Sequence, residues 1–155
     1  MSRLFIVTAA VLVCGNIASS REPLAGTWDL DRAQTNFDAG ASPQEQVLTI
    51  QKQGSNFLYT VIAASPAGPQ VVIKYTVAIR GGEGKFLIGN YDRVLHKRIN
   101  GNTREAHYFR EGKEVMSFQG LVTKEATELR ITVRGTDAQG KPIIGLSVYT
   151  RRRER

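Results

Sequence analysis

Apolar and polar residues alternate along most of the chain after residue 20, and this alternation is its main structural signal. It is clearest in residues 70–79, where five apolar side chains share one face: Val71, Ile73, Tyr75, Val77 and Ile79. A period of two residues is typical of a β-strand with one buried face. No window after residue 20 has the convincing 3.6-residue apolar period of a helix. We therefore expect an all-β protein.

Ten segments have a strand-like pattern, and turns rich in glycine, asparagine and proline separate them. The predicted strands are residues 24–30, 46–52, 57–63, 70–79, 85–88, 93–99, 103–110, 114–123, 129–134 and 143–150. The connection over residues 31–46 is long, and we expect no more than a single helical turn in it. Residues 80–84 predict a loose glycine-rich turn. Strands at such short spacing favour antiparallel pairing between sequence neighbours.

The dipeptide Asn100-Gly101 predicts a tight hairpin between the strands at 93–99 and 103–110. Asparagine and glycine best tolerate the positive φ that both central residues of a type I′ turn require. A two-residue loop also fixes which residues of the two strands face each other. The expected opposed pairs are His96 with Glu105, Val94 with His107, and Lys97 with Arg104.

Closure of the sheet follows from the number of strands. An open meander of ten strands would expose two unpaired edges, and closure into an up-and-down barrel removes both. We therefore expect an antiparallel up-and-down barrel of about eight to ten strands, with a two-sheet sandwich as the alternative. A ten-stranded barrel is wider than the eight-stranded size that side chains just fill, so this fold predicts an internal pocket.

The first predicted strand contains Gly26-Thr27-Trp28, which resembles the first strand of lipocalin-like, or calycin, barrels. In those barrels the tryptophan plugs one end. Residues 135–142 and the strand that ends at Tyr149 resemble the last hairpin of small secreted bacterial proteins of this type. The resemblance covers nearly all of residues 24–150 and implies a lipocalin-like barrel. Because those bacterial proteins mostly lack an assigned function, it supports the fold far more than an activity.

The sequence departs from the fatty-acid-binding proteins of this superfamily in two places. Those proteins have a two-helix lid between their first two strands, and the segment between Leu30 and Gln46 is too short for one. They also hold the fatty-acid carboxylate with an Arg-x-Tyr motif in the final strand. The matching residues here are Ser147, Val148 and Tyr149, so the tyrosine is present and the arginine is absent.

Residues 1–20 have the pattern of a secretory signal peptide: one early charge, a short apolar run from Leu4 to Val13, and small residues before Ser20. The apolar run is shorter than the roughly 20 residues that span a bilayer. We therefore expect cleavage after Ser20 and a secreted or periplasmic protein. A lipoprotein anchor at Cys14 is the less favoured alternative, because Val13 replaces the small residue expected before such a cysteine.

The basic residues are concentrated in the second half of the chain. Residues 93–155 hold fourteen basic and seven acidic residues, whereas residues 21–92 hold six and seven. This asymmetry predicts an anionic partner, either an acidic ligand or an anionic envelope surface. The alternative is a solvated basic surface. Residues 151–155 form a basic tail after the barrel at 21–150, and no nucleic acid is expected because the protein is exported.

The predicted hairpin register places two groups of reactive side chains together. His96, His107 and Glu105 would share one face and could ligate a transition metal, although Arg98 on that face would repel a cation. On the other face Lys97 would lie opposite Arg104, and an anion could offset the repulsion between them. The sequence has no nucleophile elbow, phosphate-binding loop or paired carboxylates. We therefore expect a non-enzyme without a metal or cofactor.

The favoured function is the binding of a small apolar or amphipathic ligand inside the barrel. We expect Tyr59 and Tyr75 to form walls of the pocket, and Arg98 to provide its polar anchor. The alternative is a cell-envelope interaction module that has no small-molecule ligand and docks through its basic half.

Overall fold

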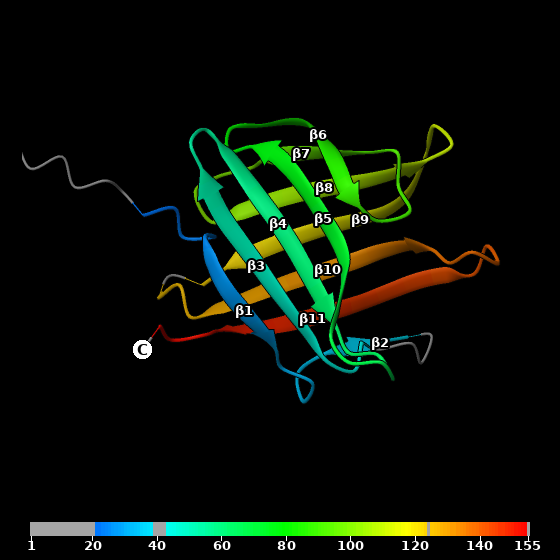
Figure 1. Ribbon diagram of the computed structural model, residues 1–155, viewed down its shortest axis with the longest axis horizontal. Coiled ribbons are helices and arrows are strands. Elements are labelled where there is room, and N and C mark those ends of the chain that lie inside the picture. The colour runs from blue at the N-terminus through cyan, green and yellow to red at the C-terminus, as the bar shows by residue number, and fades with distance from the viewer. Residues whose placement is uncertain (1–20, 39–42, 124, 155) are drawn as a thin grey trace, which may run out of the picture.

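The computed structural model describes residues 21–38, 43–123 and 125–154, and every regular element within them is a β-strand (Figure 1). The strands are β1 Gly26–Leu30, β2 Asn36–Phe37, β3 Gln46–Gln53, β4 Asn56–Ala63, β5 Gln70–Ala78, β6 Gly81–Ile88, β7 Arg93–Arg98, β8 Thr103–Arg110, β9 Lys113–Val122, β10 Glu128–Thr136 and β11 Pro142–Arg151. In these ranges no helix offers an apolar stretch long enough to cross a membrane. The predicted signal peptide and Cys14 lie outside the described residues.

Ten of the strands form a closed barrel. From β3 to β11 each strand pairs antiparallel with its sequence neighbour, β1 pairs with β3, and β1 also pairs with β11 to close the sheet. The closing ladder joins Trp28 to Arg151 and Leu30 to Tyr149. The predicted antiparallel barrel is confirmed, and the sandwich alternative is wrong. Closure removes the two unpaired edges that an open meander would leave.

The connection between β1 and β3 contains an additional short strand. The Thr35 amide donates to the Asp31 carbonyl oxygen at 3.1 Å, which closes one turn. β2 follows and pairs with β11, with Phe37 opposite Gly145. The long connection was expected to contain at most a helical turn, so β2 is an element that its two-residue length kept out of the sequence pattern.

The loose turn predicted at residues 80–84 is wrong, because Gly81–Gly84 belong to β6 and pair with β7. Gly84 lies opposite Val94, and a Cβ atom added to it would come within 2.4 Å of the Thr76 carbonyl oxygen. The glycine therefore allows β6 to lie close against β5 and β7. In this segment glycine indicates close backbone packing instead of a turn.

The register predicted for the β7–β8 hairpin is wrong by one residue. The Asn100 side chain accepts hydrogen bonds from the backbone amides of Asn102 and Thr103, at 2.8 and 2.9 Å. These bonds hold a four-residue loop over residues 99–102 in place of the two-residue turn. The observed opposed pairs are Val94 with Tyr108, Leu95 with His107, His96 with Ala106, Lys97 with Glu105, and Arg98 with Arg104.

One end of the barrel is closed by Trp28, which is fully buried. Its indole Nε1 donates to the Leu24 carbonyl oxygen at 3.0 Å. The Arg151 guanidinium lies 4.1 Å from the centre of the indole ring, and donates to the carbonyl oxygens of Pro23, Ala25 and Ala126. Arg151 was expected in a free basic tail, but it belongs to β11 and ties the two ends of the chain together.

The glycine of the Gly-x-Trp motif has a specific structural role at this end. Gly26 has a φ of 151°, and a Cβ atom on it would lie 2.3 Å from a guanidinium nitrogen of Arg151. Any larger residue at this position would displace the arginine from its carbonyl partners. The motif and Arg151 therefore form one unit.

Arg151→Ala is expected to lower the free energy of unfolding by about 3 kcal/mol, because three charge-assisted hydrogen bonds and a cation–π contact are lost. Arg152→Ala is the matched control: Arg152 forms an exposed ion pair with Asp29, and such pairs contribute roughly 0–1 kcal/mol. Urea unfolding of the two variants checks the difference. Equal losses would show that Arg151 does not hold the closed end.

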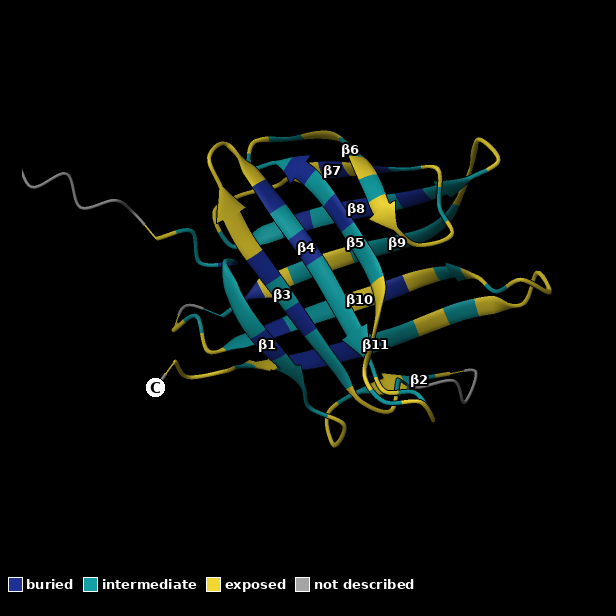
Figure 2. Cartoon of the chain, in the orientation of Figure 1, coloured by how far each residue is buried: buried dark blue, intermediate teal, exposed yellow. Residues whose placement is uncertain are grey.

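The inward faces of the strands form a single core (Figure 2). The largest fully buried side chains are Trp28, Phe57, Ile50, Leu129, Val94, Val122 and Val148. Buried and more exposed residues alternate along the strands, as the two-residue period predicts. This core does not fill the interior of the barrel.

Candidate functional site

The interior of the barrel contains a cavity of about 420 Å³ that is partly open to solvent and is called the lumen below. Strands β3, β4, β5, β7, β8, β9, β10 and β11 all contribute to its wall, because alternate residues of each strand point inward. Much of the lining is apolar, including Leu48, Ile50, Phe118, Leu129 and Ile131. Such a volume, with an apolar wall and a few polar groups, is typical of a small-molecule site.

Aromatic rings form one side of the lumen. Tyr59 of β4 and Tyr75 of β5 are opposed and stack, with ring centres 4.8 Å apart and planes 10° apart. Tyr108 meets Tyr75 edge-on at 5.7 Å and packs 4.7 Å from Phe118. The structure thus brings Tyr59 and Tyr75 into the wall of one cavity, and their contact with a ligand stays a prediction.

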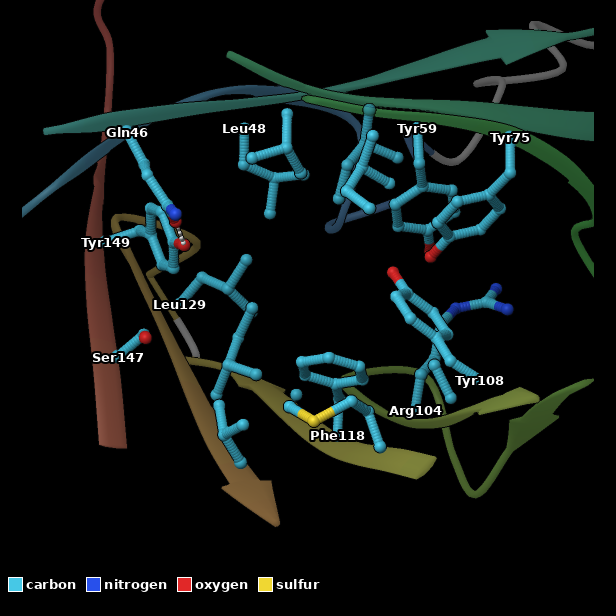
Figure 3. A pocket seen from close by; sticks show the side chains of 18 of the residues that line it. Gln46, Leu48, Tyr59, Tyr75, Arg104, Tyr108, Phe118, Leu129, Ser147 and Tyr149 are labelled. Carbon is cyan, nitrogen blue, oxygen red and sulfur yellow. Dashed lines mark hydrogen bonds between the residues drawn. The ribbon is translucent and has the colours of Figure 1, made fainter. Parts of the chain in front are cut away.

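Polar groups gather on this side in a cluster called the arginine pole, which consists of Tyr59, Tyr75, His96 and Arg104. Figure 3 shows three of them, Tyr59, Tyr75 and Arg104. The Tyr75 hydroxyl lies 2.9 Å from His96 Nε2. The Tyr59 hydroxyl, His96 Nδ1 and both terminal nitrogens of Arg104 are buried and have no hydrogen-bond partner among the described residues. Buried polar groups are normally paired, so this cluster requires a physical explanation.

Burial governs the protonation of the arginine pole. His96 is 4% exposed, and burial, with the nearby charge of Arg104 adding to it, lowers the pKa of His96 to about 3. Burial raises the pKa of the Tyr59 and Tyr75 hydroxyls above their ordinary value. At neutral pH the histidine and both tyrosines are therefore uncharged, and Arg104 is the charged group of the cluster.

Arg104 is held by its strand neighbours instead of by a counter-ion. It lies opposite Gly120 of β9, and its guanidinium carbon is 5.0 Å from the centre of the Phe57 ring. Burial lowers the pKa of Arg104, and the charge of Arg98 acts in the same direction. No ion pair involves Arg104 in the part of the chain that the structure describes.

Arg98, the anchor expected from the sequence, is not among the residues that line the lumen. Its guanidinium lies 3.6 Å from a carboxylate oxygen of Glu22, and its side chain is 38% exposed. The two arginines face each other across the hairpin, so the register error of one residue moved the expected anchor from Arg104 to Arg98. The repulsion predicted between Lys97 and Arg104 occurs instead between Arg98 and Arg104.

The opposite side of the lumen has a second polar cluster, called the glutamine pole, which consists of Gln46, Ser147 and Tyr149 (Figure 3). The Tyr149 hydroxyl donates to Gln46 Oε1 at 2.9 Å. Burial raises the pKa of Tyr149 to about 12, so this hydroxyl is neutral near pH 7. The glutamine pole is therefore uncharged, and its tyrosine is satisfied within the protein.

The metal-binding group considered from the sequence does not form. His96 points into the lumen, whereas His107 lies on the other face of the hairpin, 3.0 Å from Glu114 and 3.8 Å from Glu105. The two rings are separated because the true register pairs His96 with Ala106. No group of three metal-ligating side chains occurs among residues 21–38, 43–123 and 125–154.

Arg104, His96 and Gln46 were not recognised as lumen residues from the sequence. The alternation along β8 contained the necessary signal, since Arg104 lies an even number of residues from Ala106 and Tyr108 and therefore shares their inward face. A charged residue on an apolar face is itself an indication of a site, because charged side chains are rarely fully buried. The incorrect register concealed this signal.

A closed antiparallel barrel of ten strands around an internal cavity defines a calycin-like fold. No family model matches the chain, and no curated protein matches it. Among solved structures, the chain is similar to the zebrafish ileal bile acid-binding protein in complex with cholic acid, with a TM-score of 0.51 and 12% sequence identity. The match covers 84% of this chain and 99% of that one, and at this identity it establishes the fold alone.

Proposed function

We propose that this chain is an exported binding protein that holds a small apolar or amphipathic molecule in the lumen of its barrel. The observation that carries the proposal is the largely apolar cavity of about 420 Å³ with two separate polar clusters in its wall. Protein interiors are normally close-packed, so a cavity of this size is unusual for a structural core. A bound ligand would fill it. The presence of cholic acid in the zebrafish protein of the same fold supports an amphipathic ligand.

Export is part of this proposal and is supported by the pattern of residues 1–20. The intact mass of protein from cell-envelope fractions tests this part: cleavage after Ser20 agrees with it, and an acylated N-terminus at Cys14 would replace it with the lipoprotein alternative.

Binding of the neutral dye Nile red is expected to require the lumen. Gly120 lines the cavity, and a Cβ atom there would meet Leu129, Arg104 and Ile131 at ordinary distances of 3.6–4.0 Å. Gly120→Leu therefore extends a side chain into the lumen with little backbone strain. We expect it to weaken Nile red binding at least about tenfold, measured by dye fluorescence.

The control is the same substitution at Gly101, in an exposed loop where no atom lies within 4 Å of an added Cβ. Gly101→Leu should leave Nile red affinity within about twofold of the parent protein. Equal binding by the parent and both variants would place the dye outside the lumen and contradict the proposal. Intrinsic fluorescence is a poor reporter, because Trp28 is not part of the lining.

A further inference from the structure

Arg104 is a buried cation without a counter-ion, and this is the least expected feature of the lumen. Arg104 is 7% exposed, and neither of its terminal nitrogens has a hydrogen-bond partner within the described ranges of the chain. A guanidinium carries five donors and loses its hydration when it is buried, so an uncompensated site of this kind is costly. The contact with Phe57 at 5.0 Å offsets part of that cost, because an aromatic face attracts a cation.

Charges near Arg104 do not neutralise it. Arg98 is directly opposite across the hairpin and adds a like charge. The carboxylate of Glu22 attracts Arg104 and offsets part of this repulsion, but its ion pair is with Arg98 at 3.6 Å. The neighbouring His96 and Tyr59 are uncharged near pH 7, as their shifted pKa values indicate. The arginine pole therefore has an excess of positive charge inside an apolar cavity.

The same pole offers further unused polar atoms. The Tyr59 hydroxyl is buried and free of a partner, and so is His96 Nδ1. The Tyr75 hydroxyl shares a proton with His96 Nε2, and the tautomer of the neutral ring decides whether Nδ1 is a donor or an acceptor. In Figure 3 the hydroxyls of Tyr59 and Tyr75 point across the lumen toward Tyr108 and Arg104. The pole thus combines one charge with the neutral Tyr59 hydroxyl as a donor, which is an arrangement that suits an oxyanion.

The glutamine pole could not hold an anion equally well. Its members, Gln46, Ser147 and Tyr149, carry no positive charge, and Arg104 is the only arginine among the described residues that line the lumen. The Tyr149 hydroxyl is already used in its bond to Gln46. Figure 3 shows Arg104 and Tyr149 on opposite sides of the cavity, so the positive charge of this lumen lies across from the final strand.

We propose that the ligand is an amphipathic carboxylic acid whose carboxylate pairs with Arg104 and whose apolar body extends toward the glutamine pole. This assignment rests on the proposed binding function of the lumen. The desolvation of Arg104 occurs when the protein folds, so the ligand does not have to remove water from it again. The arginine pole selects the acid over a neutral molecule of the same shape, since only the acid compensates the buried charge.

The test compares three twelve-carbon probes as competitors of Nile red: dodecanoate, 1-dodecanol and dodecylamine. The parent protein is expected to bind dodecanoate about 10–100-fold more tightly than the alcohol, the range of a charge-assisted hydrogen bond. The amine, protonated near pH 7, should bind more weakly than the alcohol because Arg104 repels it. An alcohol that binds as tightly as the acid would overturn the assignment while leaving the proposed lumen function intact. Failure of Nile red and of every probe to bind would overturn both.

Variants then identify the arginine responsible. Arg104→Met retains an unbranched side chain without charge and should abolish the preference for the acid, with binding of the alcohol kept. It should also raise the midpoint of urea unfolding of the ligand-free protein, because an uncompensated buried charge is removed. Arg98→Met is the matched control outside the lumen and should keep the preference. The reverse outcome, with the preference lost in Arg98→Met and kept in Arg104→Met, would refute the role of Arg104.

Tyr59→Phe removes a hydroxyl that has no partner in the ligand-free protein. It should therefore leave the free energy of unfolding unchanged or slightly higher, and weaken the binding of dodecanoate about 3–10-fold, consistent with one lost hydrogen bond. Tyr149→Phe, at the glutamine pole, should change the affinities for dodecanoate and for 1-dodecanol by the same factor. Equal effects of Tyr59→Phe on both ligands would place the carboxylate elsewhere in the lumen and contradict the proposed orientation.

Discussion

Trp28→Ala is expected to lower the free energy of unfolding by about 4 kcal/mol, the largest loss predicted for a single substitution in this barrel. The side chain is fully buried, so its removal leaves a cavity at the closed end. It also removes the hydrogen bond to the Leu24 carbonyl oxygen and the surface on which Arg151 stacks. Because small domains are stable by only about 5–15 kcal/mol, much of the variant would be unfolded at elevated temperature.

Urea unfolding followed by far-ultraviolet circular dichroism measures this loss, since the substitution removes the only tryptophan. Trp28→Phe should cost roughly half as much, because it retains an aromatic ring beneath Arg151. Leu121→Ala is the control for loss of apolar surface, because Leu121 is 46% exposed and should change stability by less than about 0.5 kcal/mol. A loss at Trp28 as small as the loss at Leu121 would contradict its role as the plug.

The second large effect concerns acid stability and the buried His96. Its folded-state pKa of about 3 lies below the ordinary value of 6.5, so between these values the unfolded chain binds a proton that the barrel does not. The free energy of unfolding should therefore fall as the pH decreases from about 6.5 to about 3. The expected slope is about 1.4 kcal/mol per pH unit, and the total contribution is on the order of 5 kcal/mol.

Comparison of the parent protein with His96→Gln isolates this contribution. Glutamine can still bond to the Tyr75 hydroxyl, but it does not titrate, whereas all carboxylates titrate in both proteins. Between pH 4 and pH 6, the difference between the unfolding free energies of the two proteins should change by about 1.4 kcal/mol per pH unit, the slope that one titrating proton produces. His107→Gln, on the outer face, should retain the steep dependence because His96 remains. Parallel pH profiles for the parent and His96→Gln would contradict burial of a neutral His96.

The two-residue period was sufficient to predict the barrel and most of its strands. Each of the ten barrel strands overlaps a predicted segment, because burial of one face imposes alternation on the sequence. β2 left no such pattern, since two residues are too few to define a period. The glycines of β6 were taken for a turn because glycine is common in turns, and only the packing against β5 and β7 reveals their role.

The candidate site was harder to predict than the fold because it depends on register. A hairpin loop of four residues instead of two exchanged the partners along β7 and β8, and with them the candidate anchor. The determining interaction is the bond from Asn100 Oδ1 to two backbone amides, which stabilises the longer loop. Side-chain bonding of this kind is available to any asparagine in a turn, so the dipeptide Asn100-Gly101 is compatible with either loop.

The ladder between β5 and β6 is short, and this affects how a ligand can reach the lumen. Three residue pairs join these strands, with a register shift between Lys74 and Tyr75, whereas eight pairs join β4 and β5, with one register shift between Val61 and Ile62. Short ladders separate at a lower free energy than long ones. Immediately behind this ladder are the rings of Tyr75 and Phe86, whose centres are 5.2 Å apart. Brief separation of the two strands would therefore give a ligand lateral access to the lumen between β5 and β6, while the end of the barrel at Trp28 stays closed.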